Sequence, residues 1–225
     1  MNSIIKLQNV SKSFGSHNIL KNVSLSVAEG ETIGIVGANG SGKSVLFKII
    51  CGFETPDSGD VYVRDKKLGE NKKDFPENMG VFINSPGFIS IYSGYQNLQF
   101  LSEINGKIGE KEIKSAMSKV GLDPENKTKV ENYSLGMKQK LGLAQTFMEG
   151  QDILILDEPF NALDYRTYED VKSIIRMLKA EGKTIFLTSH HYKDIEQLCD
   201  KTYTIENGDL VPVTEEIAKR YKEIE

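Results

Sequence analysis

Residues 37–44 read GANGSGKS, and this stretch decides the fold that the sequence encodes. It follows a short apolar run, ETIGIVG at residues 31–37, and it leads into residues 43–51, whose apolar positions recur at helical spacing. A strand that enters a glycine loop and leaves it as a helix is the required context for the phosphate-binding pattern G-x-x-x-x-G-K-[ST]. The alternative, a glycine turn without a ligand, does not account for both flanking elements. The sequence therefore predicts a loop that binds a nucleoside triphosphate.

The residue types in this loop suit an anion. Gly37, Gly40 and Gly42 allow backbone conformations that a Cβ atom forbids, so successive N–H groups can face one phosphate. The helix that begins at Lys43 adds the positive end of its dipole. Lys43 supplies a charge to the β- and γ-phosphates, and the Ser44 hydroxyl can ligate Mg²⁺. We expect the whole stretch to contact the nucleotide: Gly37, Ala38, Asn39, Gly40, Ser41, Gly42, Lys43, Ser44 and Val45.

Two acidic residues follow a second apolar run, in DILILDEP at residues 152–159. Residues 153–156 predict a buried strand that delivers Asp157 to the carboxyl edge of a parallel sheet, where such sheets bind ligands. We expect Asp157 to hold Mg²⁺, through water, and Glu158 to act as the general base for an attacking water. Adjacent acids after a strand are also common helix caps, and the phosphate loop in the same chain makes that alternative the weaker one.

A third apolar run ends in TSHH at residues 188–191, where an imidazole could contact the γ-phosphate and the attacking water. These runs alternate with helical patterns, which predicts an α/β fold with a parallel sheet covered on both faces. Alternating apolar positions near the N-terminus indicate an antiparallel β region. We expect one domain over residues 1–225: a nucleotide-binding core at 1–84 and 151–225, and a helical subdomain at 85–150.

Composition narrows the class of partner. The 225 residues include 28 basic and 32 acidic side chains, a net charge of −4, so no nucleic-acid partner is expected. No apolar run reaches the roughly 18–20 residues that cross a bilayer, and residues 1–10, MNSIIKLQNV, lack the pattern of a signal peptide. Cys51 and Cys199 lie far apart, which favours reduced thiols in the cytosol over a disulfide or a metal site.

YSLGMKQK, at residues 133–140, adds a fourth motif shortly before the acidic pair. It resembles the LSGGQ signature of the ABC ATPase family, and with the other motifs in this order the resemblance covers essentially the whole chain. Ser134 and Gly136 match the signature, whereas Leu135 and Met137 depart from it. The resemblance implies a P-loop NTPase fold with a RecA-like parallel sheet core, an antiparallel β subdomain and an inserted helical subdomain. It also implies that Ser134 and Gly136 contact ATP bound to the opposite subunit of a head-to-tail dimer.

Further positions match the family one by one. Phe14 resembles the aromatic residue that stacks on adenine, although it could equally be a β-core aromatic. Asp164, in NALD at residues 161–164, resembles the loop that connects the two sites, and His190 resembles the switch histidine. Asn84 stands where the family usually places a glutamine that reaches Mg²⁺ and the attacking water. Asparagine keeps the amide but is one methylene shorter; we place Asn84 with the catalytic residues and the metal ligands.

The segment NSPGF at residues 84–88, together with YSLGMKQ, is similar to the exporter branch that includes bacitracin- and lantibiotic-resistance ATPases. This implies a subunit that binds ATP and Mg²⁺ at the cytoplasmic face of a bacterial membrane. It would pair with a second ATPase subunit, drive separate permease subunits and export a drug, peptide or lipid-like cargo. Residues 85–95 would line a groove for a permease helix or pack the joint between the lobes.

Two alternatives remain open at this point. One is a soluble ABC-type ATPase that acts on ribosomes or DNA. Those proteins resemble paired domains or carry a long insertion, whereas this chain has one signature and about 50 residues between Asn84 and Ser134. The other is a nucleotide-dependent regulator that does not hydrolyse ATP, against which the presence of Glu158 argues.

Overall fold

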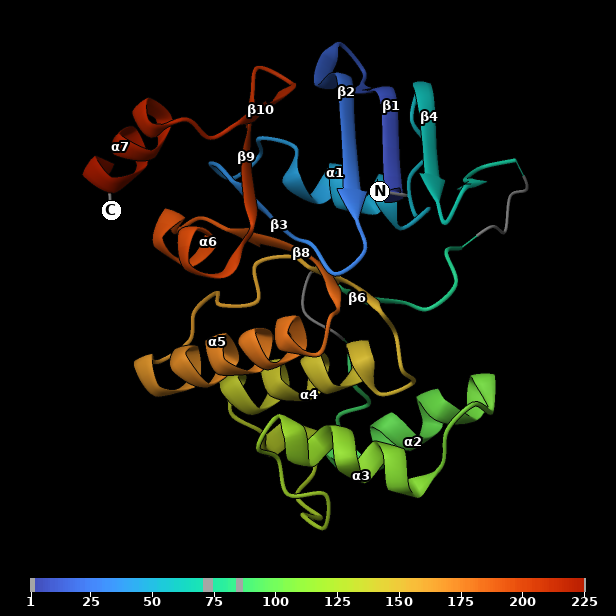
Figure 1. The fold of residues 1–225 in the computed structure, drawn as a ribbon. Helices are drawn as coiled ribbons and strands as arrows, with labels where there is room; N and C mark the ends of the chain where they lie inside the picture. The colour runs from blue at the N-terminus through green and yellow to red at the C-terminus, as the bar shows by residue number, and fades with distance from the viewer. Residues whose placement is uncertain (1–2, 71–74, 84–86, 225) are drawn as a thin grey trace.

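The computed structural model describes residues 3–70, 75–83 and 87–224. Within this part of the chain, the central sheet has six strands in the order β10-β9-β3-β8-β7-β6, and all neighbours are parallel except β10 and β9 (Figure 1). The strands are β3 (Thr32–Val36), β6 (Met79–Phe82), β7 (Ile153–Leu156), β8 (Thr184–Ser189), β9 (Lys201–Glu206) and β10 (Asp209–Pro212). Asn84, Ser85 and Pro86 lie outside the described residues.

The continuous apolar run of β7 is explained by burial on both faces of this sheet. Ile153 and Ile155 belong to one hydrophobic cluster, and Leu154 and Leu156 belong to another. Successive side chains of a strand point to opposite faces, so a strand covered on both sides needs apolar residues at every position.

A second sheet covers one face of the first. It is antiparallel, in the order β2-β1-β4-β5, and α1 (Lys43–Ile50) packs between the two sheets (Figure 1). The ring of Phe47 on α1 meets the ring of Phe186 on β8 edge to face, with centroids 5.9 Å apart. The strands are β1 (Ser3–Phe14), β2 (His17–Ala28), β4 (Ser58–Val63) and β5 (Lys66–Lys67). The phosphate loop is thereby fixed by a helix with a buried face.

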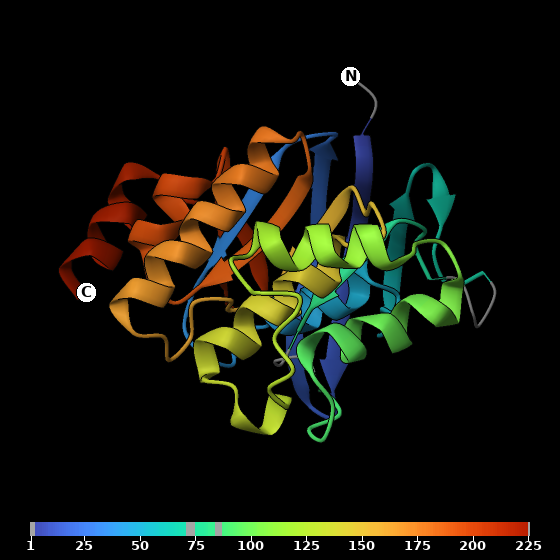
Figure 2. The ribbon, with the colours of Figure 1, turned by 90° about the horizontal axis from the view of Figure 1, so that it is seen from below.

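Helices cover the opposite face of the parallel sheet (Figures 1 and 2). Strand β6 touches α4 backbone to backbone: a Cβ atom on Gly80 would lie 1.7 Å from the carbonyl oxygen of Thr146. None of the helices in the described ranges is long and apolar enough to span a membrane. The helices are α2 (Gly94–Asn105), α3 (Glu110–Lys119), a 3₁₀ turn (Val130–Asn132), α4 (Leu135–Phe147), α5 (Tyr165–Ala180), α6 (Tyr192–Leu198) and α7 (Glu215–Ile224).

Candidate functional site

The phosphate loop has the backbone conformation that its glycines predict. The φ angles of Gly37, Gly40 and Gly42 are +153°, +81° and +108°, in the region that residues with a Cβ atom avoid. Gly42 is the N-cap of α1, so the loop runs directly into the positive end of that helix. The predicted loop and helix start are confirmed; Ala38, Asn39 and Gly40 are exposed on the loop, and Val45 packs beneath it.

Lys43 is buried and folded back on its own loop. Its Nζ donates hydrogen bonds to the carbonyl oxygens of Gly37, at 2.6 Å, and Ala38, at 3.1 Å. It also lies 3.5 Å from Oε1 of Glu158. Nearby, the Oγ of Ser41 is buried and makes no hydrogen bond within the described residues. The loop therefore holds two donors that a phosphate can satisfy.

The ends of β7 and β8 are joined through Thr188. Its hydroxyl donates to Oδ1 of Asp157 over 2.7 Å and accepts from the backbone N–H of Glu158 over 2.8 Å. Asp157 and Thr188 are both buried. One hydroxyl therefore fixes both acids, a role that the sequence pattern did not reveal although Thr188 opens the TSHH motif.

Glu158 and His190 meet across the same pair of strands. Nδ1 of His190 lies 2.9 Å from Oε2 of Glu158, and the imidazole is partly exposed. Glu158 has a φ angle of +52°, which is uncommon for a residue with a Cβ atom and is typical of constrained functional positions. The structure thus brings Lys43, Asp157, Glu158 and His190 into one bonded group.

The signature residues lie apart from that group. Ser134 is the N-cap of α4, and its Oγ accepts a hydrogen bond from the N–H of Met137 at 3.2 Å. Ser134 and Leu135 are exposed. Gly136 is buried against α5, where an added Cβ atom would lie 2.5 Å from the Thr167 side chain. No hydrogen bond or ion pair among the described residues connects Ser134 with Lys43 or Glu158.

Phe14 ends β1 and is 49% exposed, so the core-aromatic alternative does not describe it. The Nζ of Lys12 lies 5.2 Å from the centroid of its ring. Lys12 is held by Glu54, at 2.7 Å, and by Asp57, at 3.3 Å. The hydrogen bond to Glu54 raises the pKa of Lys12 above its ordinary value, so the cation beside the ring is retained. Lys12 and Phe14 are two positions apart on a strand and share one face, which the sequence could have revealed.

Asp164 is the N-cap of α5. Its carboxylate accepts from the N–H of Thr167 at 3.1 Å and from the Thr167 hydroxyl at 2.7 Å. The hydrogen bond from the Thr167 hydroxyl, followed by the one from its backbone N–H, lowers the pKa of Asp164. The carboxylate therefore stays ionised at neutral pH. Because Thr167 also contacts Gly136, this cap lies directly behind the signature segment.

Residues 20–161, more than half of the chain, match the ABC transporter family. The chain belongs to this family. The bacitracin transport ATP-binding protein BcrA of Enterococcus faecalis is 35% identical over 94% of this chain and 69% of its own length. The lantibiotic transport ATP-binding protein SrtF of Streptococcus pyogenes is 34% identical over 92% of this chain and 89% of its own length.

Solved structures support the same assignment for this ABC ATPase. The dimeric structure of a bacterial ABC transporter cassette superimposes with a TM-score of 0.80 at 26% identity, over 92% of this chain and 96% of that one. The predicted family and the predicted P-loop NTPase fold are therefore confirmed. The chain is an ATPase of the ABC transporter family, and its nucleotide is ATP.

Proposed function

We propose that this ABC ATPase is the ATP-binding subunit of a bacterial exporter that pairs head-to-tail with a second ATPase subunit, identical or related. One observation carries the proposal: the chain holds a bonded group of Lys43, Glu158 and His190 and, apart from it, an exposed signature serine, Ser134. Two copies facing each other would complete both sites. The relatives named for bacitracin and lantibiotic transport support a drug, peptide or lipid-like cargo.

ATP would bind along the phosphate loop with its adenine on the exposed face of Phe14. In this structure Lys43 donates hydrogen bonds to the carbonyl oxygens of Gly37 and Ala38. When ATP binds, Lys43 would donate to oxygens of the β- and γ-phosphates instead. The unpaired hydroxyl of Ser41 would donate to the same phosphates. Binding thereby satisfies a buried polar atom and releases Glu158 from its cation.

The oxygen donors at the carboxyl edge of the sheet suit Mg²⁺, which prefers one or two carboxylates together with phosphate oxygens. Ser44 and Asp157 would hold the ion, and Thr188 fixes the carboxylate of Asp157 for this task. Asn84, the third expected ligand, lies outside the described residues. When bound, the ion would neutralise charge between the β- and γ-phosphates.

Glu158 would accept the proton of the attacking water. Its backbone is held by Thr188, and its Oε1 is buried and makes no hydrogen bond within the described chain. His190 contacts the other carboxylate oxygen and would orient both the base and the γ-phosphate. Ser134 and Gly136 of the facing subunit would close the site with the N-terminus of their α4, while Asp164 would connect the two sites.

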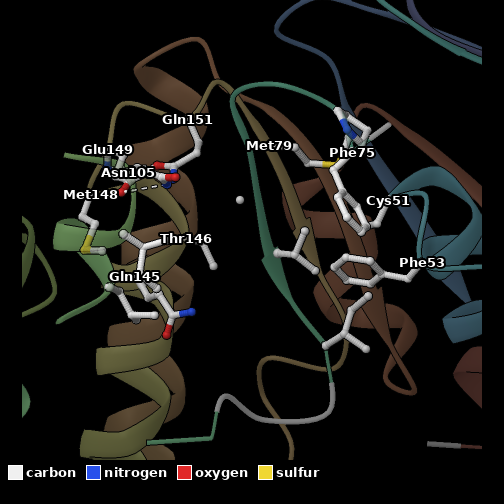
Figure 3. Close-up of a pocket in the computed structure, with 16 residues that line it drawn as sticks. Cys51, Phe53, Phe75, Met79, Asn105, Gln145, Thr146, Met148, Glu149 and Gln151 are labelled. Atoms are coloured by element: carbon white, nitrogen blue, oxygen red, sulfur yellow. Dashed lines mark hydrogen bonds between the residues drawn. The ribbon is translucent and has the colours of Figure 1, made fainter. Parts of the chain in front are cut away.

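A groove beside α4 offers a docking place for a permease at the cytoplasmic face of the membrane. It encloses about 470 Å³ between the end of α4 and the segment around β6 (Figure 3). Phe53 and Phe75 form one wall and are 55% and 60% exposed. Of residues 85–95, Phe88 and Tyr95 pack against the core, whereas Ile89 and Ile91 are exposed, and no described residue of that segment lines this groove.

The opposite wall of the groove carries a carboxylate. Both oxygens of Glu149 accept hydrogen bonds from the side-chain amide of Asn105, at 3.3 and 3.0 Å, and no cation pairs with Glu149 among the described residues (Figure 3). An apolar wall facing an uncompensated carboxylate complements a short permease segment that carries both an apolar side chain and a lysine or arginine.

Purification of the tagged chain from detergent-solubilised membranes tests this partner. We expect an integral membrane protein to be recovered, and Glu149→Lys to reduce its recovery at least several-fold. Glu223→Lys is the matched control, because Glu223 lies on α7, away from the groove (Figure 1). Recovery of ribosomes or DNA in place of a membrane protein would favour the soluble ATPase.

The catalytic assignment has its own test. Glu158→Gln should bind ATP, lose hydrolysis by roughly 100-fold or more, and accumulate as a dimer with ATP in gel filtration. A variant that hydrolyses ATP at the normal rate would contradict the role of Glu158. A variant that stays monomeric with saturating ATP would point to a different ATPase subunit as the partner, and one that binds no ATP would contradict the site.

A further inference from the structure

A buried carboxylate lies behind the catalytic group and is not used by the mechanism above. Asp194, in the first turn of α6, has no exposed surface. It accepts hydrogen bonds from the hydroxyl of Tyr168 and, at 3.3 Å, from the hydroxyl of Ser189, and the Nζ of Lys172 lies 3.4 Å away. A charge is retained in the interior only where such partners replace water.

This carboxylate is bonded to the turn that presents His190. Ser189, the residue before His190, donates its hydroxyl to Asp194 and accepts the N–H of His191 over 3.0 Å. The Ser189 hydroxyl thus ties the turn to α6, and the bond from His191 closes the turn around the histidine. The imidazole of His190 is itself partly exposed, so its direction toward Glu158 depends on the turn that carries it.

The same carboxylate is connected to the segment that carries Glu158. Tyr168 on α5 donates to Asp194, and its ring lies against the buried ring of Phe160 with centroids 5.4 Å apart. Phe160 follows Glu158 by two positions. The part-buried bond from Tyr168 to Asp194, together with the contact between Tyr168 and Phe160, therefore connects the segment that carries Glu158 with the turn that carries His190.

We propose that Asp194 is a positioning residue for ATP hydrolysis: through Ser189 it fixes the turn that points His190 at Glu158. The inference rests on the roles proposed above for Glu158 and His190. Small displacements matter here, since a misplacement of about 1 Å in a catalytic group can lower a rate by ~100-fold.

The chain offers a matched contact that is structural only. Lys179, also on α5, donates to the carbonyl of Leu198 over 2.9 Å and to Asp200 over 2.6 Å. It ties α5 to the far end of α6, away from His190. Lys179→Met removes this tie and leaves the Ser189–His191 turn untouched, so it controls for the loss of packing between the two helices.

Ser189→Ala is the main variant, because it cuts the link and leaves Asp194 with Tyr168 and Lys172. We expect it to lower kcat roughly tenfold or more with KM for ATP within about twofold, and Asp194→Asn to do the same. Lys179→Met should keep kcat. In a His190→Ala background, Ser189→Ala should lower the residual single-turnover rate no further, because both changes remove one function.

A second measurement does not depend on turnover or on the stability of Asp194→Asn. The chain has three histidines, so the imidazole resonances of His17, His190 and His191 can be assigned by single substitutions. We expect Ser189→Ala and Tyr168→Phe to shift the His190 resonances and Lys179→Met to leave them in place. Unshifted His190 resonances, or a kcat for Ser189→Ala equal to the parent, would overturn the proposal.

Different results would contradict the catalytic roles of Glu158 and His190 and the positioning role of Asp194. If His190→Ala and Glu158→Gln both hydrolyse ATP at the normal rate, the proposed catalytic roles are wrong. If those variants are impaired while Ser189→Ala is fully active, or lowers the rate equally with and without His190, only the positioning role of Asp194 is wrong.

Discussion

The two parts of the proposed nucleotide site are built in opposite ways. The phosphate-loop part is bonded within itself: Lys43 contacts Glu158, Glu158 contacts His190, and Thr188 holds Asp157. In the signature part, Ser134 is exposed, and among the residues that the structure describes its hydroxyl bonds only to the first turn of its own helix. One part has its side chains bonded to one another, and the other part presents an exposed serine. Such an arrangement is suited to a site that two subunits assemble.

The largest effect is expected when the phosphate-loop part is disrupted in one chain, the signature part is disrupted in another, and the two chains are then mixed. Lys43→Ala removes the phosphate cation, and Ser134→Asp keeps a good N-cap but places a negative charge where a phosphate is expected. We expect each variant alone to lose ATPase activity by roughly 100-fold. An equimolar mixture should recover about one quarter of the normal rate, since about half of the dimers are mixed and each contains one intact site.

The mixing experiment has a built-in control. Two variants that share one defect, such as Lys43→Ala with Lys43→Met, should recover nothing. If the complementary pair also recovers nothing although both variants fold and the normal chain dimerises, the parts are not shared between copies of this chain.

A smaller effect is expected where the signature contacts its own subunit. Gly136→Ala should destabilise the fold by about 1–3 kcal/mol, because the new methyl group meets the side chain of Thr167. Urea denaturation would measure the loss. Gly87→Ala serves as the control, because an added Cβ atom there meets nothing within 4 Å. Equal midpoints for both variants would contradict the close contact.

A smaller effect, on the affinity for ATP, is expected where Phe14 would stack on the adenine. Phe14→Ala should raise KM for ATP about threefold to tenfold with little change in kcat, because a stacked aromatic ring contributes roughly 0.5–1.5 kcal/mol beyond its burial. Phe14→Tyr should preserve the parental KM. The rate of ATP hydrolysis, measured over a range of ATP concentrations, gives the difference in KM, and an unchanged KM for Phe14→Ala would remove Phe14 from the site.

The smallest effect concerns the reactivity of the Cys51 thiol and not the rate of ATP hydrolysis. Burial, and then the negative charge of Asp157, raise the pKa of the Cys51 thiol to about 12 from 9.0. Native protein at pH 8 should therefore react with iodoacetamide far more slowly at Cys51 than unfolded protein. Between these two pKa values the unfolded chain loses the proton that the folded chain keeps, so this thiol makes the free energy of unfolding fall as pH rises. Rapid labelling of native Cys51 at pH 8 would contradict this.

The parts of the site that the sequence predicts are those encoded locally. GANGSGKS specifies its backbone through glycines, and the run at residues 153–156 places Asp157 and Glu158 at a sheet edge whatever else the chain does. The contacts that hold these residues are not local. Thr188 is 31 positions from Asp157 and Asp194 is 26 from Tyr168, and no periodicity reports which polar residues meet inside a core.

Some of the missed features had a weak signal. Tyr168 and Lys172 are four positions apart on α5 and therefore share a face, although both side chains are polar enough to be expected in solvent. The exposure of Ser134 could not be predicted, because its cap role alone fits a buried helix end equally well. The subdomain boundaries and the roles of individual site residues, Asn84 among them, stay predictions.

The length of α4 determines how far Ser134 moves when the helix tilts. Ser134 stands at one end, and Thr146, which lines the groove, rests on Gly80 near the other. The 12 residue steps from Ser134 to Thr146 span about 18 Å at 1.5 Å per residue. Each degree of rotation about the Gly80 contact therefore moves Ser134 by about 0.3 Å, and a tilt of about 5° moves it by ~1.5 Å, enough to make or break a hydrogen bond. A permease segment bound in the groove would therefore need to tilt α4 by only a few degrees to make or break the proposed contact between Ser134 and a phosphate.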